Sequence, residues 1–118
     1  MPGYNHITLV GNLTKDPELK KAGESVRSSF ALAVNGNYKK EDGSSPVDFI
    51  NVVAWGKLAE TCSEYLEKGK RVLVDGQLHI REYEKDSQKK FFTEVCADKI
   101  TFLDFSSPAA AKKSPSKN

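Results

Sequence analysis

Hydrophobic and polar residues alternate along much of this sequence, and a period of two predicts β-strands. The first segment is predicted as a strand because it is rich in β-branched and aliphatic residues, and Gly11 inside it indicates a bulge or a sharp bend. The intervening segments are rich in Gly, Pro, Ser and charged residues, which predicts loops, the middle one being an exposed hairpin loop. We expect strands at residues 4–13, 26–34, 47–56, 71–83 and 91–105, and loops at 14–25, 37–46 and 84–90.

One segment departs from the alternation and predicts a single helix at residues 57–68. Its apolar residues Leu58, Cys62, Tyr65 and Leu66 recur at helical spacing, and Gly69 stands where a left-handed residue would end the helix. Five strands with a helix between the third and the fourth are typical of the OB-fold, a small Greek-key barrel. An RNA-recognition-motif sheet is not favoured, because it needs a second helix. We therefore expect an all-β fold with one helix.

The parity of the strands separates an inner from an outer face. In the third strand Ile50, Val52 and Ala54 form an aliphatic face suited to a barrel interior, opposite a face that holds two aromatic residues. The inner sets of the second and fourth strands are Val26, Ser28, Phe30, Leu32, Val34 and Val72, Val74, Leu78, Ile80. The outer sets are Arg27, Ser29, Ala31, Ala33, then Phe49, Asn51, Val53, Trp55, and Asp75, Gln77, His79, Arg81, Tyr83.

The net charge does not make the expected domain a basic protein. The chain has 18 basic and 16 acidic residues, which gives +2. Three of the lysines lie in residues 105–118, which offer almost nothing to a core and predict a disordered, short basic tail after a domain at 1–104. Removing those three leaves 15 basic against 16 acidic residues, or −1, for residues 1–108. Nucleic-acid affinity would therefore have to come from local clusters of charge or from stacking.

Catalytic and metal-binding motifs do not occur. The sequence contains no GxSxG, HExxH, Gly-rich phosphate loop or CxxC, and neither His6 nor His79 has a carboxylate or cysteine at ligand spacing. Cys62 and Cys96 lie 34 positions apart, whereas zinc cysteines usually come in close pairs, so we interpret both as small buried hydrophobic residues. We expect no enzyme, cofactor or metal site. An active site assembled from distant residues stays open as an alternative.

The expected location is the cytoplasm. The N-terminal segment lacks the basic and long apolar regions of a signal peptide, and no apolar run approaches the roughly 20 residues that span a bilayer.

Four aromatic residues are expected outside the core, with basic residues between them. Single-stranded nucleic acid needs this arrangement, because bases stack on aromatic planes for about 1 to 3 kcal/mol each while cations follow the phosphates. The alternative is that these aromatic residues pack against a partner chain or under loops. The candidate DNA-binding residues are Tyr38, Phe49, Trp55, Tyr83, Lys39, Lys40, Lys57, Arg81 and His79.

Six segments resemble the bacterial single-stranded DNA-binding protein (SSB) family. They are VGNLTKDPEL (10–19), FALAVN (30–35), DFINVVAWGKLAE (48–60), YLEKG (65–69), VDGQL (74–78) and TEVCADKITFL (93–103). The resemblance implies an OB-fold that assembles as a homotetramer, associates with the nucleoid and binds single-stranded DNA in replication, recombination and repair.

The resemblance also implies site residues. The four stacking positions of the family fall on Tyr38, Phe49, Trp55 and Tyr83. The best-known members have tryptophan at the first, second and fourth of these and phenylalanine at the third, so the aromatic types are redistributed here. Lys57 matches a family lysine.

Other positions depart from the family pattern. His6 and Glu82 replace lysines of some members. The family usually ends in an acidic tip that recruits replication and repair proteins, and SPSKN does not resemble it. The remaining alternative is an OB-fold protein-interaction subunit of a replication-restart type assembly.

Overall fold

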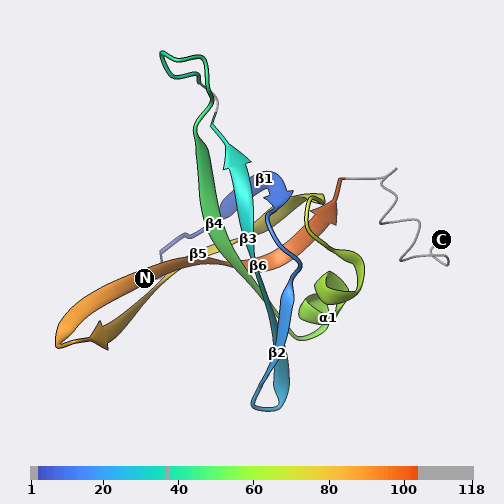
Figure 1. Ribbon diagram of the computed structural model, residues 1–118. Helices are drawn as coiled ribbons and strands as arrows, with labels where there is room; N and C mark the ends of the chain where they lie inside the picture. Colours follow the sequence, from blue (N-terminus) through green and yellow to red (C-terminus); the bar gives the residue numbers. More distant parts are fainter. Residues whose placement is uncertain (1–2, 37, 104–118) are drawn as a thin grey trace.

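The computed structural model describes residues 3–36 and 38–103. These residues form six strands and one helix (Figure 1). In chain order the elements are β1 (Ile7–Leu13), β2 (Glu18–Ala22), β3 (Ser25–Asn35), β4 (Val47–Trp55), α1 (Gly56–Tyr65), β5 (Arg71–Lys85) and β6 (Gln88–Phe102).

The strands close into a ring, as the expected OB-fold requires. Their order is β1-β5-β6-β4-β3-β2, and β1 pairs with β3 as well as with β5, so that five of the strands return to their starting point. The contact between β4 and β6 is parallel and consists of Val52 opposite Val95 and Val53 opposite Cys96. All other pairings are antiparallel.

Two glycines lie where neighbouring strands approach closely. A Cβ at Gly11 would overlap the carbonyl oxygen of Ala33, next to the position where Asn12 pairs with both β5 and β3. The expected bend at Gly11 is thus a close approach at the strand that closes the barrel. Gly76 meets the carbonyl oxygen of Cys96 in the same way, beside a register shift between Asp75 and Gly76.

The core is made by the inner faces that the parity predicts. Leu32, Val52, Ala54, Val74 and Val95 are fully buried. Within the described residues α1 adds Ala59 and Cys62 to this core, and no helix there has the length and apolar character that crossing a membrane requires.

Leu78 and Ile80 do not belong to the core, contrary to the prediction. They are 40% and 56% exposed. The reason is that β5 and β6 continue beyond the barrel as a two-stranded arm (Figure 1), and no other helix or strand of the described residues covers the side on which Leu78 and Ile80 lie. We call residues 78–94 of this hairpin the arm.

Two segments expected as loops contain strands. Glu18–Ala22, inside the expected loop at 14–25, pairs with β3, and all five of its residues are exposed, so its sequence carries no hydrophobic alternation. The expected turn at 84–90 shrinks to Asp86 and Ser87, whose φ angles are 53° and 64°. A two-residue turn with positive φ at both positions matches the twist of the flanking strands, which lets both strands continue to it.

Some element boundaries also differ from the prediction. The first strand begins at Ile7 rather than residue 4, and α1 ends at Tyr65 rather than 68 because Leu66 is already extended. Gly69 has the expected left-handed φ of 91°, but in the connection to β5. The last strand ends at Phe102, and the tail predicted at 105–118 lies outside the described residues.

Candidate nucleic-acid interface

The hydrogen-bond register joins the outer faces of four strands into one continuous surface. On β4 this surface holds Phe49, Asn51, Val53 and Trp55, and Val53 is paired with Cys96 on β6. Partners in register project to the same side of a sheet, so every second residue continues the surface along each strand. It includes Arg27, Ser29, Ala31 and Ala33 on β3, Lys90, Phe92, Glu94 and Cys96 on β6, and Gln77, His79, Arg81 and Tyr83 on β5. We call this set the outer face.

Three of the four predicted stacking residues lie on the outer face with exposed side chains. Phe49 is 68% exposed, Trp55 48% and Tyr83 47%. The prediction that Phe49 and Trp55 lie outside the core is therefore confirmed. Both project from the side of β4 opposite the buried Val52 and Ala54. Val53 lies between Phe49 and Trp55 on the same side of β4 yet is only 2% exposed, at the position where β4 pairs with Cys96 of β6.

Trp55 is placed by the junction between β4 and α1. It is the last strand residue and has extended backbone angles, whereas Gly56 directly after it has a φ of 63°. This left-handed conformation favours glycine and turns the chain sharply from strand into helix. Lys57, in the first turn of the helix, is exposed close to Trp55 in the chain.

Tyr38, Lys39 and Lys40 lie apart from the outer face. They are exposed on the loop that joins β3 and β4, which extends from the far end of that hairpin (Figure 1). The loop is ordered by its own hydrogen bonds, since Lys40 N–H donates to Ser44 O at 2.7 Å. Donation from the hydroxyl and the backbone N–H of Ser44 lowers the pKa of the Asp42 carboxyl.

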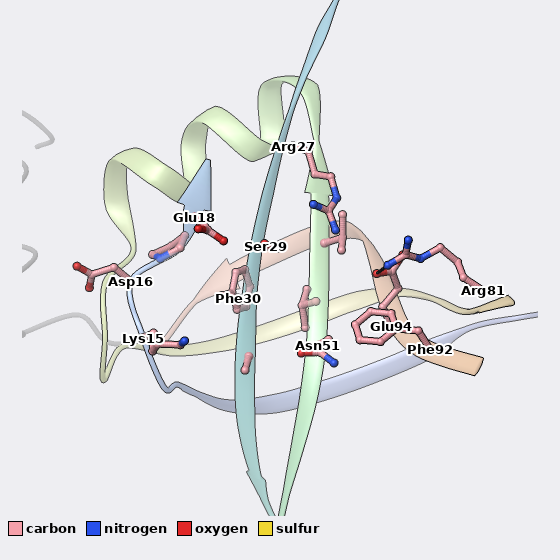
Figure 2. Close-up of a pocket in the computed structure, with 14 residues that line it drawn as sticks. Lys15, Asp16, Glu18, Arg27, Ser29, Phe30, Asn51, Arg81, Phe92 and Glu94 are labelled. Carbon is pink, nitrogen blue, oxygen red and sulfur yellow. Dashed lines mark hydrogen bonds and ion pairs between the residues drawn. The ribbon is translucent and has the colours of Figure 1, made fainter. Parts of the chain in front are cut away.

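A pocket of about 430 Å³ opens on the outer face between the barrel and the arm (Figure 2). Its ionisable lining carries equal numbers of opposite charges: Lys15, Arg27 and Arg81 against Asp16, Glu18 and Glu94. Bulk charge therefore contributes little here, and separate basic side chains are the available partners for phosphate.

Arg81 is a pocket cation that contacts both a carboxylate and an aromatic ring. Its Nη2 donates to Glu94 Oε1 at 3.4 Å, and its Nε lies 3.4 Å from Oε2. The central carbon Cζ of the Arg81 guanidinium lies 5.0 Å from the centroid of the Phe92 ring (Figure 2). A ring and a carboxylate thus fix one planar cation at the edge of the pocket.

Comparison with known proteins agrees with this architecture. A family model described as "Single-strand binding protein family" matches residues 4–103. The chain belongs to the single-strand binding protein family. Family membership confirms the resemblance that the sequence motifs indicated.

Curated relatives of this family are similar over most of the chain. The single-stranded DNA-binding protein of Clostridium tetani (strain Massachusetts / E88) is 45% identical over 105 residues, which are 86% of this chain and 71% of the relative. Single-stranded DNA-binding protein 2 of Staphylococcus aureus (strain Mu50) is 48% identical over 102 residues, 85% of this chain and 72% of the relative.

A solved structure shares the fold. It is titled "Plasmodium falciparum SSB complex with ssDNA" and superposes with a TM-score of 0.79 at 28% identity, covering 88% of this chain and 98% of the other. The OB-fold expected from the sequence is confirmed by this match and by the closed ring of strands.

Three residues that line the pocket are not among the candidate site residues of the sequence analysis. The strand parity puts Arg27 and Asn51 on the outer side without assigning them to a site, and it makes no statement about Phe92. Phe92 alternates with Glu94 and Cys96 and is out of phase with the buried Val95, so parity in the last strand carried the signal.

The two cysteines have different environments, although both were expected to be buried. Cys62 is fully buried in the core, and burial raises the pKa of its thiol to about 12. Cys96 is half-buried on the outer face. Burial, followed by the negative charges of Glu94 and Asp98, raises its pKa.

The histidines also have carboxylate neighbours that sequence spacing did not reveal. His79 Nδ1 lies 3.6 Å from Glu94 Oε2, and His6 Nε2 lies 3.6 Å from Asp75 Oδ1. Only the pairing of distant strands brings these groups together.

Proposed function

We propose that this chain binds and protects single-stranded DNA without sequence preference and without catalysing a reaction on it. The observation that carries the proposal is the strand register, which puts the exposed rings of Phe49, Trp55 and Tyr83 on one face together with Arg27 and Arg81. Bases stack on such rings whatever their identity, because every base has a π-face.

Stacking is the larger part of the proposed affinity. Residues 1–108 carry a net charge of −1 and the pocket lining is balanced, so the phosphates meet separate cations rather than a broad basic surface. We propose that the contacts come from Tyr38, Phe49, Trp55 and Tyr83 for the bases, and from Lys39, Lys40, Lys57, Arg27, Arg81 and His79 for the backbone.

Similar proteins support the proposal. The curated relatives are named for binding single-stranded DNA, and the structurally similar Plasmodium protein is described in complex with it. We also propose a role in DNA replication, recombination and repair, a location in the cytoplasm at the nucleoid, and residues 1–104 as the binding domain.

We further propose that the chain assembles as a homotetramer. On the side of the arm opposite the outer face, which we call its apolar side, Leu78, Ile80 and Phe91 are exposed, and Phe91 is 65% exposed. An apolar strip of this kind favours burial against another chain. It lies on the side of the hairpin opposite Tyr83 and Arg81, so assembly through it leaves the outer face open.

Fluorescence of Trp55, the only tryptophan of the chain, tests DNA binding directly. We expect an oligo(dT) to quench it saturably at moderate salt, because a base stacks on the indole. Duplex DNA of the same length is the control and should quench little, since its bases are already stacked. Unchanged fluorescence at saturating oligo(dT), or equal quenching by the duplex, would contradict the proposal.

A further inference from the structure

Three side chains with different metal-ligand atoms meet on the outer face where the arm joins the barrel. His79 on β5 is opposite Glu94 on β6 in the register, and Cys96 follows two positions later on the same side of β6. The imidazole nitrogen, carboxylate oxygen and sulfur of these residues all lie within 4.8 Å of one another. His79 Nδ1 and Glu94 Oε2 are 3.6 Å apart.

We propose that His79, Glu94 and Cys96 form a binding site for a zinc ion. Ligand atoms about 2.0–2.3 Å from a tetrahedral zinc ion lie roughly 3.3–3.8 Å from one another. The His79 to Glu94 separation already falls in this range, and the spread of 4.8 Å requires only small side-chain movements. A water molecule would complete the four-coordinate shell.

The ligand types select zinc over the common hard cations. Calcium and magnesium prefer sites made of oxygen atoms alone, whereas zinc accepts imidazole, thiolate and carboxylate together. On binding, the Cys96 thiol would lose its proton to the solvent. The resulting thiolate and the Glu94 carboxylate offset the two positive charges of the ion, and the Arg81 guanidinium remains as a further positive charge beside the site.

The contacts with Arg81 and His79 do not fully satisfy the buried carboxylate of Glu94. This carboxylate is only 7% exposed, yet its contacts to Arg81 and His79 are 3.4–3.6 Å long. Charge-assisted hydrogen bonds are normally about 2.7–2.9 Å. Arg81 also has the Phe92 ring as a partner, so it can remain in place when Glu94 turns toward an ion.

The chain contains matched controls. His6 and Asp75 form a second histidine–carboxylate pair, also at 3.6 Å, but no cysteine belongs to that pair among the described residues. Cys62 is a second thiol, and it is buried in the core away from solvent. A genuine site therefore depends on Cys96 and His79 and not on His6.

Cobalt(II), which substitutes for zinc and is coloured, tests the site without DNA. The metal-free full chain is titrated with Co²⁺, and we expect visible ligand-field bands and a near-ultraviolet thiolate-to-cobalt band, both abolished by one equivalent of Zn²⁺. In Cys96→Ser the thiolate band should be lost. In His79→Gln the affinity should fall by about 10-fold or more, and in His6→Gln it should not change.

Folding is checked by circular dichroism for each variant. The His79 side chain is 55% exposed, so its replacement by Gln removes a ligand without opening the core. No thiolate band in the unmodified chain, a band that persists in Cys96→Ser, or equal weakening by His6→Gln and His79→Gln would each overturn the proposal. Failure of DNA binding has no effect on this readout.

Discussion

Arg27 on β3 stands directly opposite Trp55 on β4 in the antiparallel register. Directly paired residues have Cβ atoms about 4.5–5.5 Å apart and project to the same side. A cation and the lone indole of the chain therefore occupy one end of the outer face. A nucleotide whose base stacks on Trp55 would bring its phosphate within reach of the guanidinium.

Replacing Arg27 by Ala should weaken binding to all single-stranded sequences alike. Loss of one phosphate contact is expected to reduce the slope of log K against log salt by about 0.7. Titrations at four or more salt concentrations measure this slope. Lys21→Ala is the control, because Lys21 is paired with Val26 on the other side of the β2–β3 hairpin. An unchanged slope in Arg27→Ala would remove Arg27 from the interface.

The two sides of the arm should differ in their effect on DNA. Tyr83 is paired with Lys90 on the outer face, and Phe91 is paired with Glu82 on the opposite side. We expect Tyr83→Ala to weaken binding by about 1 to 3 kcal/mol, since one stacking platform is lost. Phe91→Ala should leave the affinity for a short oligonucleotide unchanged. Anisotropy titrations compare the two, and equal losses would contradict the face assignment.

The apolar side of the arm should control assembly. If the homotetramer forms through it, analytical ultracentrifugation gives about four times the chain mass of 13.1 kDa. Ile80→Glu places a charge in that interface and should shift the chain to smaller species. Lys90→Gln, an exposed change on the outer face of the arm, is the control. A wild-type monomer, or an Ile80→Glu variant that remains tetrameric, would refute assembly through this strip.

Gly76 should be among the least replaceable residues of the fold. A Cβ there overlaps the backbone of Cys96, so strands β5 and β6 have to separate locally to admit alanine. Overpacking of this kind costs about 1 to 3 kcal/mol or more of unfolding free energy. Urea unfolding measures it, with Gly3→Ala as the control because nothing lies within 4 Å of its Cβ position. Equal free energies of unfolding for Gly76→Ala and Gly3→Ala would contradict the expected overlap between the new Cβ and β6.

Cys62 should make stability depend on pH in the alkaline range. The pKa of its thiol is about 12 in the fold and 9.0 ordinarily, so the folded chain keeps a proton that the unfolded chain releases. The resulting stabilisation is complete below pH 9 and is lost as the pH rises toward 12. We therefore expect the stability difference between the wild type and Cys62→Ala to narrow between pH 8 and pH 11. A constant difference would contradict the raised pKa.

The sequence alone determined the barrel and much of its outer face. Where one side of a strand is buried, apolar residues must recur with a period of two, and this placed Val52 and Ala54 inside and Phe49 and Trp55 outside. The family motifs agreed with that pattern. Parity failed for Leu78 and Ile80, because the same alternation continues along the arm after the barrel has ended.

Only the tertiary structure decided the remaining features. Glu18–Ala22 is exposed throughout, so no burial pattern marks it as a strand. His79 and Glu94 are 15 positions apart and meet because the turn at Asp86 and Ser87 sets the register of the arm. A shift of one residue would place each side chain on the opposite face. Burial of one side of a strand requires apolar residues at every second position, and this period can be read from the sequence. The register between two strands depends on the backbone geometry of the turn that joins them, and the alternation of apolar residues does not specify that geometry.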